Sequence, residues 1–76
     1  MSELEWLDIF AGNLLDMMVE ARMTQKDLAD LTGLSEGTIS KYIRRMQMPG
    51  VKALVNISYA LNCSLDDLMD FGGKLD

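Results

Sequence analysis

The sequence predicts an all-α domain, and three kinds of pattern point to it. Residues that commonly cap helices precede stretches in which apolar side chains recur with helical spacing. No segment alternates apolar and polar residues with the period of two that a half-buried strand needs. The single proline, Pro49, stands beside Gly50, where the pair marks a turn. We therefore expect five helices, near residues 3–22, 25–32, 36–46, 51–61 and 65–71.

Most of the helix starts can be read from local chemistry. Ser2 is followed three residues later by Glu5, an arrangement in which hydroxyl and carboxylate each satisfy a free backbone amide. Thr24, Ser35 and Ser64 are further N-cap candidates before the second, third and fifth helices. Gly33 suits a left-handed residue that closes the second helix.

The first helix has an unusually broad apolar arc. At 100° per residue, one half of its circumference collects Leu4, Leu7, Phe10, Ala11, Leu14, Leu15, Met17, Met18 and Ala21. Trp6 and Ile9 lie at or beyond its edge. A core-facing helix needs a stripe of only about 100°. Two explanations stay open: the domain wraps this helix on several sides, or part of the arc is a subunit interface.

Composition excludes several classes of function. The 76 residues suffice for one small domain, and the single Cys cannot form an internal disulfide. With no His, the chain has neither a Cys/His zinc site nor a Ser-His or Cys-His nucleophile. No apolar run is long enough to span a membrane, and no signal peptide is evident. We expect a cytosolic domain that needs no cofactor or metal, is not an enzyme, and has no evident small-molecule ligand or membrane partner.

The net charge of −5 is unevenly distributed. Residues 1–21 have a net charge of −5, residues 22–45 of +2 and residues 46–76 of −2. Charges separated by more than a Debye length of about 8–10 Å are largely screened, so the local balance decides what a surface attracts. The basic middle third is therefore compatible with nucleic acid although the whole chain is acidic.

The third expected helix has two different faces. One face is apolar and holds Ile39, Tyr42, Ile43 and Met46; the other is small, polar or cationic and holds Gly37, Ser40, Lys41 and Arg44, with Arg45 beside them. Small residues allow close approach to a base pair, Ser and Lys reach base edges, and Arg meets phosphate. This pattern suits insertion into the major groove of DNA.

The run from Thr24 to Tyr42, TQKDLADLTGLSEGTISKY, resembles the helix-turn-helix of the lambda-repressor-like (Cro/repressor) family. The resemblance rests on the Thr-Gln start, Leu-Ala, Gly-Leu-Ser at the turn, and Ile-Ser in the second helix, and it continues through Pro49, Leu54, Ile57, Ala60, Leu61, Leu65 and Leu68. It implies that residues 1–76 form a single compact five-helix DNA-binding domain, with its helix-turn-helix unit at about 24–46. It also implies a homodimer that binds double-stranded DNA.

The resemblance assigns candidate DNA-binding residues position by position. Gln25 matches a phosphate contact and Ser35 a helix cap that also touches the DNA backbone. Glu36, Gly37 and Lys41 match base-reading positions, with Thr38 and Ser40 nearby, although Glu36 can equally serve only to complement the helix dipole. Arg44, Arg45, Gln47 and Lys52 are expected to clamp the DNA backbone.

Two departures from the family pattern stand out. Relatives often pair an Arg at the position of Met18 with a Glu at the position of Ile43; here both are apolar, and we expect these two side chains to touch. The first helix is acidic where relatives are often basic, which favours a role for a protein partner.

We interpret the chain as a sequence-specific transcriptional regulator, a repressor of phage or mobile-element type, in the bacterial cytoplasm at the nucleoid. The alternative is an antitoxin-like or other protein-interaction module with the same fold. We expect the dimer interface at the fifth helix and its tail (Leu68, Met69, Phe71, Leu75) or on the outer part of the first helix (Trp6, Ile9).

Overall fold

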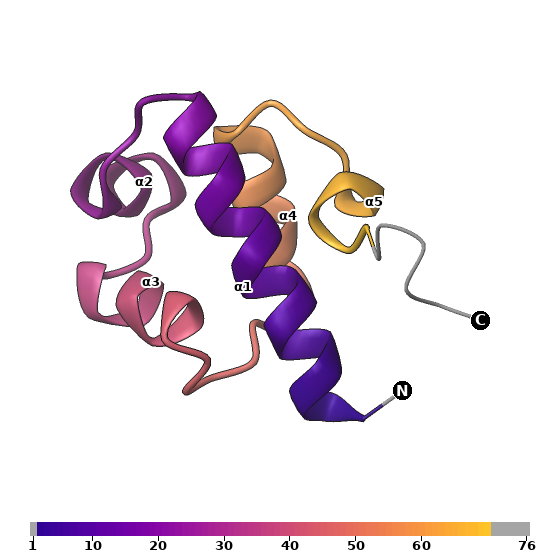
Figure 1. Cartoon of the computed structure of the whole chain (residues 1–76). Coiled ribbons are helices and arrows are strands. Elements are labelled where there is room, and N and C mark those ends of the chain that lie inside the picture. Colours follow the sequence, from indigo (N-terminus) through magenta and orange to yellow (C-terminus); the bar gives the residue numbers. More distant parts are fainter. Residues whose placement is uncertain (1, 71–76) are drawn as a thin grey trace.

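A computed structural model describes residues 2–70, and these residues form five helices and no strand (Figure 1). The helices are α1 (Glu3–Glu20), α2 (Gln25–Thr32), α3 (Glu36–Ile43), α4 (Val51–Ala60) and α5 (Leu65–Leu68). The expected all-α class and the order of five helices are confirmed. Of the residues named for a dimer interface, Phe71 and Leu75 lie outside the described range.

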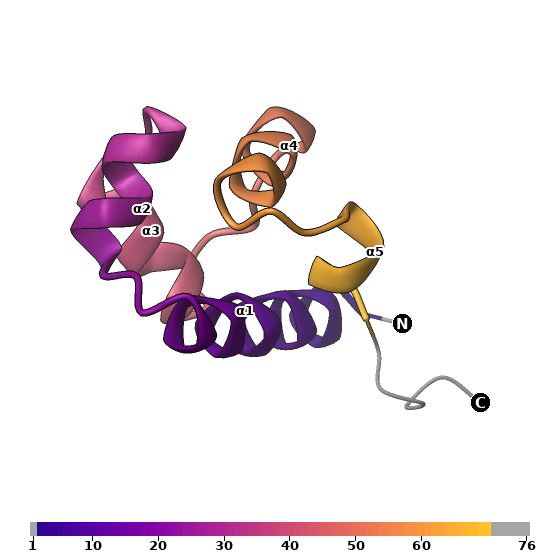
Figure 2. The same ribbon diagram turned by 90° about the horizontal axis from the view of Figure 1, so that it is seen from above.

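The long α1 is the element on which the others are assembled. It contacts α3 and α5 directly, while α2 packs on α3 and α4, and α4 packs on α5. Seen from above, α1 lies along one side of the domain and the other four helices all lie on its inner side, with α2 and α3 at one edge, α4 in the middle and α5 at the other edge (Figure 2). In the view of Figure 1, α3 and α5 therefore lie to the left and to the right of α1.

The predicted helix starts are confirmed at the level of hydrogen bonds. The hydroxyl oxygens of Ser2, Thr24, Ser35 and Ser64 each accept a hydrogen bond from the backbone N–H three residues later, at 3.0–3.2 Å. At three of the four starts the acidic residue at that position also accepts from the cap's own N–H, which completes a capping box. Gly33 closes α2 with a φ of 76°.

The predicted end of α2 at residue 32 is confirmed, the other four predicted helix ends were too late, and three of the real ends share one geometry. After α1, α3 and α4 the chain turns through a left-handed residue, namely Arg22, Arg45 and Asn62, with φ of 54°, 61° and 52°. After α3, Arg45 N–H donates to Tyr42 O at 3.1 Å and Met46 N–H donates to Lys41 O at 2.8 Å. This pair of bonds is a Schellman motif, which stops the helix. Because none of the three residues is glycine, the sequence did not reveal these ends.

The core is built on one narrow stripe of α1. Leu7, Phe10, Leu14 and Met18 are buried there, against Leu28, Ile39, Tyr42, Ile57 and Leu68 of the other helices. The rings of Phe10 and Tyr42 meet edge to face, with centroids 5.9 Å apart and planes at 77°. Ile43 is half-buried and packs against the same core as Met18; a direct contact between these two side chains stays a prediction.

Part of the apolar arc of α1 is not covered. Ala11 is buried and Met17 is half-buried, but Leu4, Leu15 and Ala21 are exposed, as is Val19 beside the arc, which keeps 68% of its surface. The interpretation that the domain wraps α1 on several sides therefore accounts for most of the arc but not for its exposed residues. The alternative, a subunit interface on this arc, is left open.

Candidate nucleic-acid interface

The third helix presents one face to the core and the other to solvent. Ile39 and Tyr42 are buried on the inner face, and burial raises the pKa of the Tyr42 hydroxyl. Gly37 and Lys41, one turn apart, are exposed on the outer face. Since α2 and α1 hold the inner face, the outer face is fixed in direction relative to the whole domain. The two-faced pattern predicted for residues 36–46 is confirmed over residues 36–43 only.

Met46 departs from the predicted pattern. It was expected on the apolar face of a helix reaching residue 46, but its side chain is 64% exposed. The reason is the end of α3 at Ile43, after which the left-handed Arg45 redirects the chain. Helical spacing therefore no longer places Met46 in line with Ile39 and Tyr42.

The candidate residues lie on α3 and on the segments next to it along the chain. Most are exposed: Gln25 at the start of α2, Ser35, Glu36, Gly37 and Lys41 on or before α3, Arg44, Arg45 and Gln47 in the following turn, and Lys52 in the first turn of α4. Thr38 and Ser40 are half-buried. The Ser35 hydroxyl donates to Thr38 Oγ1 at 2.9 Å while it accepts from Thr38 N–H, so both hydroxyls take part in the cap of α3.

No contact within the domain requires a glycine at position 37. A Cβ atom built there would meet only the Ser35 hydroxyl oxygen, at 3.8 Å, which is an ordinary contact. The residue lies inside a right-handed helix, where glycine costs up to about 1 kcal/mol relative to alanine. The space that glycine leaves is therefore on the outer surface, where an approaching ligand would occupy it.

Arg45, which was expected to clamp the DNA backbone, is already engaged within the domain. Its Nε donates to Asp8 Oδ1 of α1 at 2.7 Å, and its Nη1 donates to the carbonyl oxygen of Ile43 at 2.9 Å. By contrast, Lys41 and Arg44 make no ion pair or side-chain hydrogen bond within residues 2–70. Asp8 is the residue near this face that sequence reasoning missed, because nothing local connects two positions 37 residues apart.

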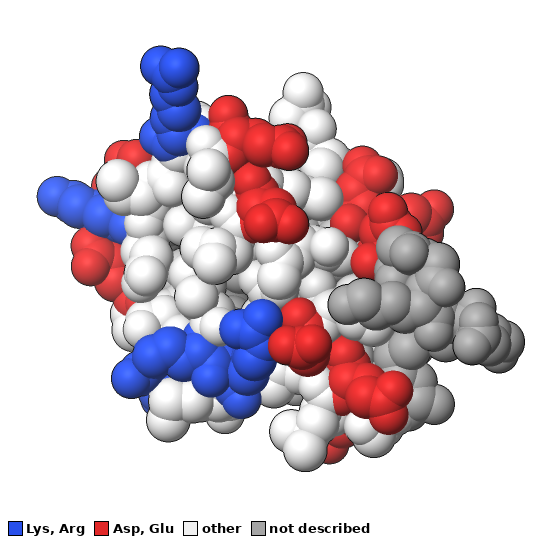
Figure 3. Space-filling view, in the orientation of Figure 1, with Lys and Arg blue, Asp and Glu red and all other residues white. Residues whose placement is uncertain are grey.

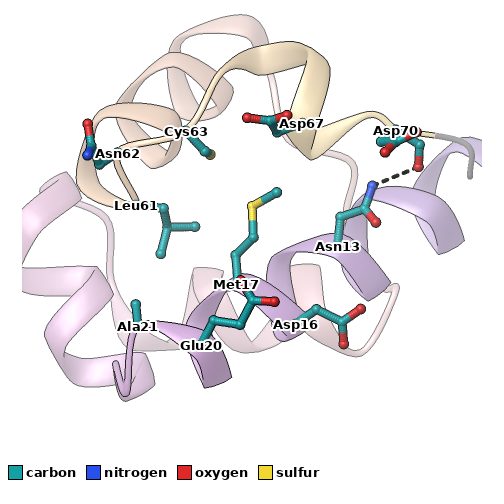
Figure 4. A pocket seen from close by; sticks show the side chains of 10 residues that line it. All are labelled: Asn13, Asp16, Met17, Glu20, Ala21, Leu61, Asn62, Cys63, Asp67 and Asp70. Atoms are coloured by element: carbon teal, nitrogen blue, oxygen red, sulfur yellow. Dashed lines mark hydrogen bonds between the residues drawn. The ribbon is translucent and has the colours of Figure 1, made fainter.

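Positive and negative side chains lie on different parts of the surface. Basic side chains gather over α3 and its following turn, where they meet an acidic side chain of α1, and other acidic side chains gather toward α5 (Figure 3). On the α5 side of α1 there is a groove of about 530 Å³ with Met17 in its floor and four carboxylates, Asp16, Glu20, Asp67 and Asp70, around it (Figure 4). No Lys or Arg is among the described residues that line it. Phosphate is repelled from this side and attracted to α3.

Cys63 also lines the acidic groove. Burial, together with the charge of Asp67, raises the pKa of its thiol. The side chain is half-buried and packs against the core, as a small hydrophobic residue would. Among residues 2–70, no group of His, Cys, Asp and Glu is arranged to hold a metal ion. Within the same range, no helix has the length and apolar character required to cross a membrane.

The capped helix pair α2–α3, with a glycine turn and an exposed cationic second helix, defines a helix-turn-helix domain. The family model for the Cro/C1-type helix-turn-helix DNA-binding domain matches residues 13–73, and the chain belongs to this family. The family resemblance read from the sequence is thereby confirmed.

Two similar proteins extend this comparison. The chain is 33% identical over 61 residues to an uncharacterized HTH-type transcriptional regulator, YqaE, of Bacillus subtilis (strain 168). The match includes 80% of this chain but 53% of that protein, so the chain spans about half the length of this relative. A crystal structure of the restriction-modification controller protein C.AhdI from Aeromonas hydrophila superposes with a TM-score of 0.78 at 21% identity, over 82% of this chain and 94% of that one. This second likeness shows the fold.

Proposed function

We propose that the protein is a sequence-specific DNA-binding transcriptional regulator that inserts α3 into the major groove. The observation that carries the proposal is the outer face of α3, where Gly37 and Lys41 are exposed directly opposite the buried Ile39 and Tyr42. The rigid inner face holds the helix, and the outer face combines close approach with a free cation, as direct readout requires. The name of the Bacillus relative supports a role in transcription.

The candidate residues differ in which part of the DNA they would contact. Lys41 reads guanine O6 and N7, and Glu36 accepts from a cytosine amino group. Gly37 lets the helix approach the base edges. Gln25 and Ser35 contact phosphate near helix N-termini, where free backbone amides favour anions. The remaining candidates contact the DNA backbone or the bases at the edge of the interface: Thr38, Ser40, Arg44, Gln47 and Lys52.

The protein acts as a homodimer on DNA. A single recognition helix reads only a few base pairs, whereas two-fold dimers read half-sites about 34–36 Å apart. Leu68, named from the sequence for the interface, is buried in the protein's own core and cannot serve. The face of α4 that holds Val51, Val55 and Tyr59 at successive turns is the better interface, and Tyr59 is 80% exposed.

Charge favours the α4 face over the α5 side. Two copies that met at the groove between α1 and α5 would bring the carboxylates of Asp16, Glu20, Asp67 and Asp70 against their equivalents without a compensating base. The α4 face carries no acid, since helix α4 has Lys52 as its only charged residue. Tyr59→Glu should convert a dimer into a monomer in sedimentation experiments without unfolding it. An unchanged dimer would refute this interface.

The test of the function is selection of DNA from random or genomic fragments, followed by footprinting of the selected sites. We expect a two-fold symmetric site with strong salt dependence. Equal binding to all sequences, or none at low salt, would refute the proposal. In the organism, we propose a phage or mobile-element type repressor that acts in the bacterial cytoplasm at the nucleoid.

The acidic groove favours a second candidate function, a protein-interaction or antitoxin-like module. Its four carboxylates around Met17 suit a basic protein segment and not DNA. A protein partner retained at high salt, with DNA binding absent, would select this alternative. Both functions can also coexist, because the groove is lined by Asp67 of α5, and α5 and α3 lie to different sides of α1 in the view of Figure 1.

A further inference from the structure

Arg45 has a left-handed backbone conformation, and its side chain reaches across the fold to α1. Its φ of 61° lies in the left-handed region, which L-residues with a side chain disfavour and glycine tolerates. An outlier of this kind persists only where the surroundings determine it. Here the surroundings are the two backbone hydrogen bonds of the Schellman motif, to which the side chain adds bonds to the carboxylate of Asp8 on α1 and to the carbonyl oxygen of Ile43.

The guanidinium group of Arg45 rests against α1. A Cβ atom built on Gly12, one turn beyond Asp8, would lie 4.0 Å from Arg45 Nη2. Nε and Nη1 of Arg45 are therefore hydrogen-bonded, and Nη2 faces the backbone of α1 at Gly12. The side chain of Arg45 nevertheless remains 42% exposed and that of Asp8 62% exposed, so the pair is open to solvent and to a competing anion.

Position makes this pair relevant to DNA. Arg45 follows the recognition helix by two residues and belongs to the basic cluster that covers α3 and its following turn (Figure 3). A DNA phosphate at this turn offers the guanidinium the same paired acceptor geometry as a carboxylate. The phosphate must therefore displace Asp8, and the displaced carboxylate then adds repulsion to the bound state.

We propose that Asp8 restrains DNA binding by occupying Arg45, so that Asp8 sets the affinity of the DNA face although it lies on α1. This inference rests on the proposed function. A purely structural link between α1 and the end of α3 is the competing explanation. It requires that loss of Asp8 weaken DNA binding or leave it unchanged, whereas restraint requires that loss of Asp8 strengthen it.

The test compares DNA affinity and its salt dependence for the wild type, Asp8→Asn, Arg45→Gln and the double variant. Asp8→Asn should raise affinity about two- to fivefold, the range that corresponds to breaking an exposed ion pair. The slope of log affinity against log salt should steepen by up to about 0.9, one additional phosphate contact. Both changes should vanish when Arg45 is already Gln.

Asp16→Asn is the matched control, because Asp16 is another exposed acid of α1 that lines the groove on the α5 side. It reports the effect of removing one negative charge from the domain without releasing Arg45. Urea denaturation of each variant shows whether the fold is kept. Unchanged or weaker binding by Asp8→Asn, or a gain no larger than that of Asp16→Asn or one that persists with Gln at position 45, would overturn the inference. A wild type that binds no DNA would instead refute the proposed function.

Discussion

Lys41→Ala offers the sharpest test of direct readout by α3. Lys41 is exposed and makes no ion pair or side-chain hydrogen bond within residues 2–70, so its ammonium group is available to a base edge. Loss of one good base contact costs about 1–3 kcal/mol, which corresponds to a roughly 5- to 150-fold weaker affinity. The loss should be confined to sites that carry the preferred base pair at one position in each half-site.

Arg44→Ala is the matched control, because Arg44 is equally exposed, lies one turn further along, and is equally free of side-chain partners within the described residues. It should weaken binding to all sequences alike and lower the salt slope by about 0.9. Neither substitution should change the free energy of unfolding by more than about 0.5 kcal/mol, since both side chains are on the surface.

The assay is a competition between the selected site, single base-pair variants of it and unrelated DNA, repeated at several salt concentrations. Direct readout predicts that Lys41→Ala flattens the preference at one position and that Arg44→Ala does not. Equal, sequence-independent losses for the two variants would refute the reasoning. The domain would then be a backbone binder whose specificity lies elsewhere.

Three other predictions concern the same helix and the acidic groove. Gly37→Gln should abolish specific DNA binding while the free energy of unfolding stays equal or rises, because the position is open within the domain and glutamine favours helix; retained specific binding would show that close approach at residue 37 is not needed. Ile43→Ala should cost about 1–2 kcal/mol in urea denaturation, less than the 2–5 kcal/mol of full burial, and a cost near zero would remove Ile43 from the core. The Cys63 thiol, whose pKa is raised by burial and by Asp67, should react more slowly with iodoacetamide at pH 8 than in the urea-unfolded chain. Since the thiol pKa is higher in the folded than in the unfolded chain, the free energy of unfolding should fall as pH rises through these two values. Asp67→Asn should speed the reaction of Cys63 with iodoacetamide, and an unchanged rate would contradict the contribution of Asp67 to the raised pKa.

The sequence revealed where helices begin because N-caps are local. Ser2, Thr24, Ser35 and Ser64 each act on an amide three residues away, so a four-residue window contains the whole interaction. Helix ends were less visible. Gly33 marked one end, but Arg22, Arg45 and Asn62 reach the left-handed region without being glycine. The two backbone hydrogen bonds that close each of these ends are local, but no residue type in the sequence marks them.

The candidate face shows the same division between local and distant information. The inward direction of Ile39 and Tyr42 and the outward direction of Lys41 follow from helical spacing, which holds until Ile43. Beyond that residue the spacing failed, and Met46 is exposed. The family resemblance indicated which residues are candidates but not what they contact within the domain. It assigned Arg45 to the DNA backbone, whereas in the fold the guanidinium of Arg45 forms an ion pair with Asp8 of α1.

Charge distribution explains why a second copy matters for such a small domain. With Arg45 held by Asp8, the basic residues proposed to meet phosphate are reduced to Lys52 and Arg44, with Lys41 directed at a base. For two phosphate contacts, a rise from 50 to 200 mM salt weakens binding only about 12-fold, whereas four contacts in a dimer weaken it about 150-fold. With so few phosphate contacts, the monomer also binds non-specific DNA weakly, and the acidic side chains of α1 weaken that binding further. Affinity therefore has to come from base contacts and from dimerisation, and both depend on the fixed direction of α3.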